Sequence, residues 1–206
     1  MIANINTSET VTSIKDTTAN PAPLGLLGFG MTTILLNLHN ANLIELDSMI
    51  MGMGLFMGGI AQIFAGLQEW KKNNTFGATA FTAYGSFWLS LVAIWLIPKT
   101  NFGASFKSSD NALGWYLLLW GVFTLFMFIG TLRLNKVLQV VFLSLTVLFF
   151  LLSISFFTGN ASLKIFAGYE GIFCGLSAFY GCVAQVLNEI YRREVLPMGI
   201  KKLTSV

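Results

Sequence analysis

Two ionisable side chains lie within or beside apolar sequence and could carry protons. Glu170 is the one acidic residue well inside a long apolar stretch, and His39 is the only histidine of the chain. A charge at the centre of a bilayer costs about 2.5–3.5 kcal/mol on insertion scales, so such a group is either functional or neutralised by its surroundings. Glu170 follows Lys164 by six residues, roughly 9 Å of helix, which also allows a structural carboxyl group near a helix end. We favour structural roles for Glu170 and His39 and keep proton coupling as the alternative.

A second group of polar side chains could hydrogen-bond a small anion weakly. It consists of hydroxyl and amide groups in the apolar stretches: Thr32, Thr33, Asn37, Gln62, Tyr84 and Ser86. No Arg or Lys falls inside those stretches, so a bidentate clamp that would hold a carboxylate tightly is not expected. Weak sites in series favour conduction, because a permeating solute must leave as readily as it enters. These residues indicate a passage.

The same inventory argues against an enzyme and against nucleic-acid binding. One histidine and one intramembrane carboxyl group cannot supply the ligand cluster of a metal-dependent enzyme, and no Ser/His arrangement for a nucleophile is evident. Cys174 and Cys182 lie eight residues apart in apolar sequence and indicate neither a disulfide framework nor a metal site. The net charge of +3 comes from short loops and the C-terminus and forms no basic patch. We expect no cofactor and no metal.

The elements that must position these residues are membrane-spanning helices. Apolar residues make up 55% of the 206 positions and charged residues 10%, against about 25% charged in an average soluble domain. Mean hydropathy is +0.72. A helix needs roughly 20 apolar residues to cross the hydrocarbon core. Six stretches qualify, and the sequence therefore predicts an all-α integral membrane protein with six transmembrane helices, at approximately 23–41, 48–69, 76–97, 112–132, 137–158 and 164–190.

Loop charges predict the orientation. With six spans, nine basic residues fall on the side of the termini and three on the other side. The nine are Lys15, Lys71, Lys72, Arg133, Lys136, Arg192, Arg193, Lys201 and Lys202; the three are Lys99, Lys107 and Lys164. The positive-inside rule then places both termini in the cytoplasm of a prokaryotic plasma (inner) membrane. The expected domains are a polar tail at 1–19, a six-helix transport domain at 20–191 and a basic tail at 192–206.

Small residues predict close helix packing in the second span. Gly52, Gly59 and Gly66 recur every seven residues, and such glycines let helix backbones approach where lipid removes the hydrophobic incentive to associate. Gln62 lies on the same stripe. Its amide is explained equally well by an interhelical hydrogen bond and by a position in the lining of a pore.

The most specific motif is Asn-Pro-Ala-Pro-Leu-Gly-Leu at 20–26. Asn20 can cap the first free N–H groups of a helix, and the two prolines suit its first turn. This heptapeptide resembles the signature of the acetate uptake transporter family, the succinate–acetate permease group. Further segments resemble the family in order, so the likeness covers almost everything after residue 19; they are 28–33, 36–40, 81–88, 121–124, 168–171 and 187–189.

The resemblance implies a narrow monocarboxylate pathway through each six-helix protomer of a ring-shaped homo-oligomer, a homo-hexamer. It places the constriction on Phe29, Tyr84 and Leu143, with Leu145 nearby as the alternative. Leu176 stands where a smaller residue is expected in some relatives, which leaves the width of the passage open. With the polar groups named above, the substrate-binding or pore-lining candidates are Asn20, Leu24, Thr32, Thr33, Asn37, Gln62, Ser86 and Leu176.

These observations favour membrane transport of acetate and similar small carboxylates, with succinate as a further candidate. The alternatives are a proton-coupled acetate symporter that uses Glu170 or His39, and a non-transporting membrane scaffold or sensor. The expected partners are the carboxylate, the lipid bilayer and further copies of the same chain.

Overall fold

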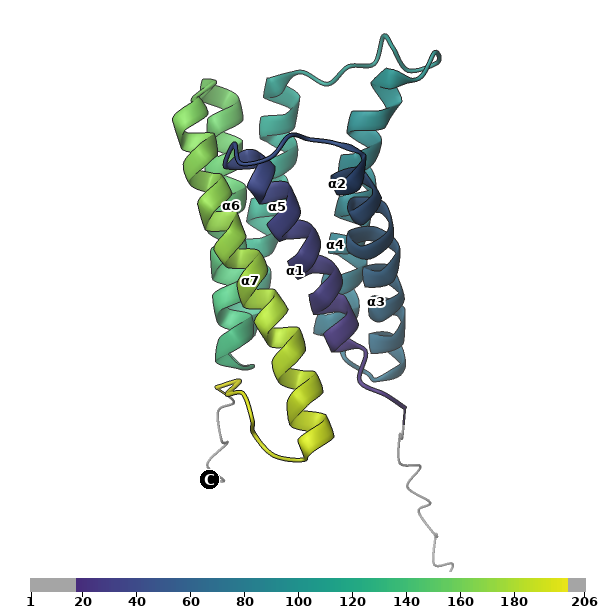
Figure 1. The fold of residues 1–206 in the computed structure, drawn as a ribbon, viewed down its shortest axis with the longest axis vertical. Helices are drawn as coiled ribbons and strands as arrows, with labels where there is room; N and C mark the ends of the chain where they lie inside the picture. The colour runs from purple at the N-terminus through teal and green to yellow at the C-terminus, as the bar shows by residue number, and fades with distance from the viewer. Residues whose placement is uncertain (1–17, 200–206) are drawn as a thin grey trace, which may run out of the picture.

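The structure is a computed structural model, and it describes residues 18–199. This part of the chain forms a bundle of helices (Figure 1). The helices are α1 (Ala22–Asn40), α2 (Ser48–Met53), η1 (Gly54–Ala61), α3 (Gln62–Lys71), α4 (Thr75–Leu96), η2 (Ile97–Lys99), α5 (Asp110–Thr131), α6 (Lys136–Thr158) and α7 (Ala161–Tyr191). The second span is continuous from α2 through the π-helix η1 to α3.

Among residues 18–199, six helical segments are long and apolar enough to cross a membrane, which confirms the predicted fold class. Their ends differ from the predicted ones by three residues or fewer. Polar caps explain why the helices begin where they do. The side-chain oxygens of Asn74, Ser109, Asn135 and Asn160 accept hydrogen bonds from free N–H groups at the starts of α4, α5, α6 and α7. At α1 the Asn20 Oδ1 accepts from the N–H of Ala22 at 3.1 Å, as its position before the prolines predicts.

The spans follow one another around a central axis. α1 packs against α7, α7 against α6, α6 against α5, and the second span packs against both α1 and α4. α4 and α5 make few backbone approaches and meet through aromatic side chains instead, such as Phe87 stacked on Tyr116 with ring centroids 5.6 Å apart. The bundle is therefore closed by side chains on this side, and its centre is lined by α1, α4, α5 and α6.

Glycines permit the closest helix contacts. In the α1–α7 seam a Cβ added at Gly30 would lie 2.9 Å from the carbonyl oxygen of Gly175. In the second span a Cβ at Gly58 would lie 2.7 Å from the Trp88 ring of α4, and Gly59 and Gly66 also press against α4. Gly52 has no neighbouring atom within 4 Å of an added Cβ, so the predicted glycine stripe packs along all but its first member.

The two ends of the described chain lie at the same end of the bundle (Figure 1). Residues 192–199 fold back on the helices: the N–H of Lys136 donates to the carbonyl oxygen of Gly199 at 3.2 Å, and Met198 is buried. The described part of the expected basic tail, residues 192–199, therefore packs against the bundle. Residues 1–17 and 200–206 of the two expected tails lie outside the described residues.

Candidate functional site

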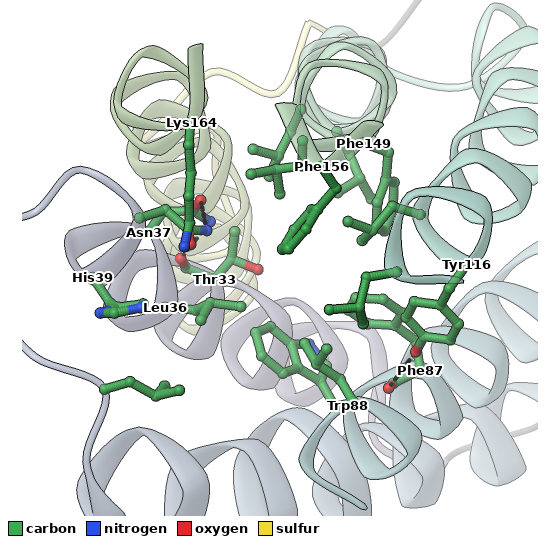
Figure 2. Close-up of a pocket in the computed structure, with 18 of the residues that line it drawn as sticks. Thr33, Leu36, Asn37, His39, Phe87, Trp88, Tyr116, Phe149, Phe156 and Lys164 are labelled. Carbon is green, nitrogen blue, oxygen red and sulfur yellow. Dashed lines mark hydrogen bonds between the residues drawn. The ribbon is translucent and has the colours of Figure 1, made fainter. Parts of the chain in front are cut away.

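One cavity, of about 230 Å³, lies at the end of the bundle where α1 finishes and α7 begins. Most of its wall consists of apolar and aromatic side chains from α1, α4, α5 and α6. Figure 2 shows that α1 and α7 bring polar side chains to one side of it, facing the aromatic side chains opposite. These polar residues are Thr33, Asn37, His39, Asn40 and Lys164. We call this space the Lys164 cavity.

A second cavity, of about 730 Å³, lies at the other end of the bundle. The start of α1, the end of α3, the start of α4 and the link between α5 and α6 surround it. Its polar lining consists of Asn20, Glu69, Asn74, Arg133, Asn135 and Gln185. We call this space the Arg133 cavity.

Both cavities are lined by residues of α1, α4 and α6, at different positions along each helix. On α1 the lining passes from the Arg133 cavity to the Lys164 cavity between Leu26 and Phe29, and on α6 between Phe142 and Leu145. On α4 it passes between Phe81 and Phe87. The cavities are therefore arranged along one axis, with a thin layer of side chains between them.

Tyr84 lies in that layer. It is on α4 between Phe81 and Phe87, is only 3% exposed and lines neither cavity. Its ring centroid lies 6.0 Å from that of Phe29 on one side and 6.0 Å from that of Phe142 on the other. Its hydroxyl group is 2.9 Å from the Thr124 hydroxyl of α5, which fixes the ring across the axis. Phe29 and Tyr84 are thus brought together as the resemblance implies, and Phe142 and Thr124 are parts of the layer that sequence reasoning missed.

Leu143 does not join this layer, and its assignment to the constriction is corrected here. Its side chain is 48% exposed on the outer face of α6, whereas Leu145 is 3% exposed and lines the Lys164 cavity with Phe29. The spacing of residues along α6 could have identified Leu145 as the inward-facing leucine. Inward residues of α6 recur in steps of three and four, and Leu145 belongs to this series while Leu143 does not; the series is Leu138, Phe142, Leu145, Phe149, Leu152 and Phe156.

The other predicted pore-lining residues divide into three groups. Thr33 and Asn37 line the Lys164 cavity, and Asn20 lines the Arg133 cavity, where its amide also donates to Gln185 Oε1 at 3.0 Å. Thr32 and Gln62 are fully buried outside both cavities. The Gln62 Oε1 has no hydrogen-bond partner among residues 18–199, so neither explanation offered for this amide accounts for its oxygen.

The third group faces outward and is corrected. Leu24 is 42% exposed and Leu176 51% exposed, and neither lines a cavity. Ser86 is also exposed, and its hydroxyl group donates to the carbonyl oxygen of Thr82 in its own helix at 2.9 Å. Leu176 therefore cannot set the width of the passage within the protomer.

The two ionisable candidates occupy different environments. His39 lines the Lys164 cavity, and its Nδ1 lies 3.2 Å from the Ile44 carbonyl oxygen, which can only accept, so Nδ1 carries hydrogen in this contact. Glu170 lines neither cavity. Its Oε1 accepts a hydrogen bond from Ser144 of α6, and its Oε2 is buried without a partner among residues 18–199. Glu170 therefore lies away from both cavities, with one of its two carboxyl oxygens hydrogen-bonded.

A cationic side chain lines each of the two cavities. α7 begins at Ala161, so Lys164 lies in its first turn, and its side chain points into the cavity that bears its name (Figure 2). Arg133 lines the second cavity. Counting charges within the spans could not reveal this, because both side chains reach the cavities from span ends.

The comparisons with known proteins agree with this architecture. The model of the GPR1/FUN34/yaaH family matches residues 3–198. This chain belongs to that family. The family resemblance read from the heptapeptide and the later segments is therefore confirmed.

Relatives of the family extend over nearly the whole chain. The succinate-acetate/proton symporter SatP of Escherichia coli strain K12 is 63% identical over 181 residues, which cover 88% of this chain and 95% of that protein. The ammonia transport outward protein 2 of Saccharomyces cerevisiae is 38% identical over 174 residues, 82% of this chain and 61% of that protein. The solved structure of the bacterial acetate channel SatP superposes with a TM-score of 0.86 at 62% identity, covering 88% of this chain and 99% of that one.

Proposed function

We propose that this protein moves acetate and similar small monocarboxylates across the membrane through each protomer. The observation that carries the proposal is the pair of cavities at opposite ends of one axis, separated at Tyr84 by a thin apolar layer. The name of the Escherichia coli relative and that of the solved structure both concern acetate and support this choice of solute.

The chemistry of the layer suits a small acid. Phe29, Tyr84 and Leu145 present rings and methyl groups, which accept the methyl group of acetic acid and offer little to a strongly hydrated ion. Protonated acetic acid crosses such a layer at lower cost than acetate does, so flux rises as pH falls even without a dedicated proton site. Succinate has a second carboxyl group to dehydrate, so we expect it to pass more slowly.

We extend the proposal to the surroundings of the transport domain. Both termini are assigned to the cytoplasmic side of the inner membrane, because the basic loops gather at the end of the bundle that holds the Arg133 cavity. The assembly is assigned as a homo-hexamer. Large apolar side chains on the outside, such as Phe126, Phe166 and Phe173, suit contact with lipid or with a neighbouring protomer.

Acetate uptake into proteoliposomes tests the proposal. We expect radiolabelled acetate to enter vesicles that contain the protein along its own concentration gradient, without an imposed pH gradient, and not to enter protein-free vesicles faster than by permeation of the free acid. The lack of any protein-dependent flux would contradict transport and favour a scaffold or sensor.

The same vesicles separate a channel from a proton-coupled symporter. The names of the two SatP comparisons differ on this point, one stating a proton symporter and the other a channel. Glu170 lies outside both cavities, which favours the channel. A fixed number of protons carried with each acetate ion, lost on Glu170→Gln or His39→Gln, would favour the symporter.

A pair of leucine substitutions tests the corrected constriction. Leu145→Ala is expected to admit a larger acid such as lactate, raising its flux relative to acetate by about tenfold, because a side chain at the narrow level becomes smaller. Leu143→Ala is the matched control: it removes the same atoms from the same helix but from an outward face, and should leave selectivity unchanged. Competition of lactate with labelled acetate measures both. A change confined to Leu143→Ala would reverse our assignment.

A further inference from the structure

We propose that the Lys164 cavity is a capture site for a carboxylate anion, in which the Lys164 ammonium group supplies the charge. The inference rests on the proposed transport of monocarboxylates and assigns to that passage a specific first binding site. It adds Lys164 to the residues that bind the solute, a role that the apolar composition of the spans did not predict.

The position of the ammonium group is the first support. Lys164 lies in the first turn of α7 and lines the cavity, and Figure 2 shows its side chain extending into the space beside Asn37 and Thr33. The ammonium nitrogen lies 5.8 Å from the centre of the Phe156 ring, an aromatic contact that holds the side chain over the cavity. It forms no ion pair with any carboxylate among residues 18–199, so its charge is available to a ligand.

Buried hydrogen-bonding groups beside Lys164 are the second support. Thr33 is only 3% exposed and lines the cavity, yet its hydroxyl oxygen has no partner in the described part of the chain. Leaving a buried hydroxyl group unpaired costs about 1–3 kcal/mol, which a bound ligand would recover. This unpaired group is independent of the lysine and points to a ligand in the same cavity.

Two amides complete the set of donors. The Asn40 amide nitrogen donates to Asn37 Oδ1 at 3.0 Å, and the Asn37 amide nitrogen donates to the Thr33 carbonyl oxygen at 2.9 Å. Each of these nitrogens carries two hydrogens, so each has one left after these bonds. These bonds orient both amides and leave one N–H donor on each for a ligand.

The rest of the cavity selects the size and class of the ligand. The wall opposite the donors is made of apolar side chains, among them Leu145, Leu148 and Phe149, which suit a short alkyl group. A volume of about 230 Å³ accommodates an acid of a few carbon atoms. The ligand is therefore a small monocarboxylate, with its carboxylate toward Lys164 and its alkyl group toward the layer at Tyr84.

Substitution of Lys164 tests the site, with Lys99 as the matched control. Lys99 is exposed in η2, at the same end of the bundle and outside the cavity, so Lys99→Gln removes the same charge without touching the site. In phosphatidylcholine vesicles at low ionic strength, Lys164→Gln is expected to raise the half-saturating acetate concentration about tenfold, the effect of one charge-assisted contact. Lys164→Arg and Lys99→Gln should stay close to the unmodified protein, and added salt should reduce the difference.

Binding is measured separately so that this inference and the transport proposal can fail independently. Carbon-13 acetate is titrated into the purified full-length protein, and its line broadening should weaken in Lys164→Gln and persist in Lys164→Arg. Binding that depends on Lys164 in a protein without acetate flux would support the capture site and refute transport. Acetate flux with the same half-saturating concentration in Lys164→Gln, verified as folded by its thermal unfolding, would overturn the capture site alone.

Discussion

Replacing Tyr84 by alanine is expected to raise acetate flux by at least about tenfold and to abolish discrimination against larger acids. The Tyr84 ring contacts one residue of each cavity, Phe29 and Phe142, and lines neither cavity. Removing it joins the cavities and lets water follow the solute through the layer, which lowers the dehydration barrier. A barrier decrease of only about 1.4 kcal/mol gives a tenfold faster rate. Uptake of labelled acetate, lactate and benzoate by proteoliposomes measures the change.

Tyr84→Phe is the control for this substitution. It keeps the ring in the layer and loses only the hydrogen bond to Thr124, which contributes about 1 kcal/mol to stability. We expect its flux and selectivity to remain close to those of the unmodified protein. Tyr84→Ala also leaves a core cavity at a cost of about 3–5 kcal/mol, so Tyr84→Leu serves as a second variant with a smaller loss of packing. Unchanged flux in folded Tyr84→Ala or folded Tyr84→Leu would show that the route does not pass Tyr84.

The sequence was sufficient for the spans because their information is local. Twenty-residue apolar stretches, Asn or Ser caps and short polar links fix where each helix begins and ends, whichever neighbours it acquires. The entrance at Asn20 follows from the same local chemistry, and its side chain bonds the N–H that its position predicts.

The candidate site could be predicted only in part, because it depends on which face of each helix turns inward. Phe29, Thr33 and Asn37 share an inward face of α1 that their spacing predicts. Leu143 was misplaced because a match of residue types in a leucine-rich helix leaves the register open, and a shift of two residues turns the side chain away from the axis. The same uncertainty about which helix face turns inward explains the wrong assignments of Leu24, Ser86 and Leu176. Neither the polarity of a residue nor its place in a motif determines where its side chain points.

The positions of Lys164 and Arg133 could not be predicted from the sequence for a different reason. Both lie near span ends, where a long side chain can reach either toward water or back into a cavity, and only the packing of neighbouring helices decides between these. In this chain both side chains line cavities, so a cation lies at each end of the proposed route, with Glu69 also lining the Arg133 cavity. The Lys164 ammonium group attracts anions to its cavity, while the layer at Tyr84 contains no charged side chain.

A substitution in the α1–α7 seam is expected to have a large effect on stability. A Cβ added at Gly168 would lie 2.7 Å from the Cα of Ala41 and from the carbonyl carbon of Asn40, and closer still to the backbone nitrogen of Ala41. Backbone atoms cannot rotate aside as a side chain does, so α1 and α7 must separate. Overpacking typically costs about 1–3 kcal/mol, and a backbone collision belongs at the upper end or beyond. We therefore expect Gly168→Ala to lower the free energy of unfolding by about 3 kcal/mol.

Gly52→Ala provides the matched comparison for that loss. An added Cβ at Gly52 meets no atom within 4 Å, and alanine is about 1 kcal/mol more favourable than glycine inside a helix, so this variant should be as stable as the unmodified protein or slightly more so. Equilibrium unfolding in mixed micelles of SDS and a mild detergent measures both. Because Gly168 lies one helical turn from Lys164 and packs on Asn40, separation of α1 from α7 should also weaken acetate capture in Gly168→Ala. Equal stability of the two alanine variants would mean that the seam is looser than these contacts require, and that the donors of the Lys164 cavity are not held in place by it.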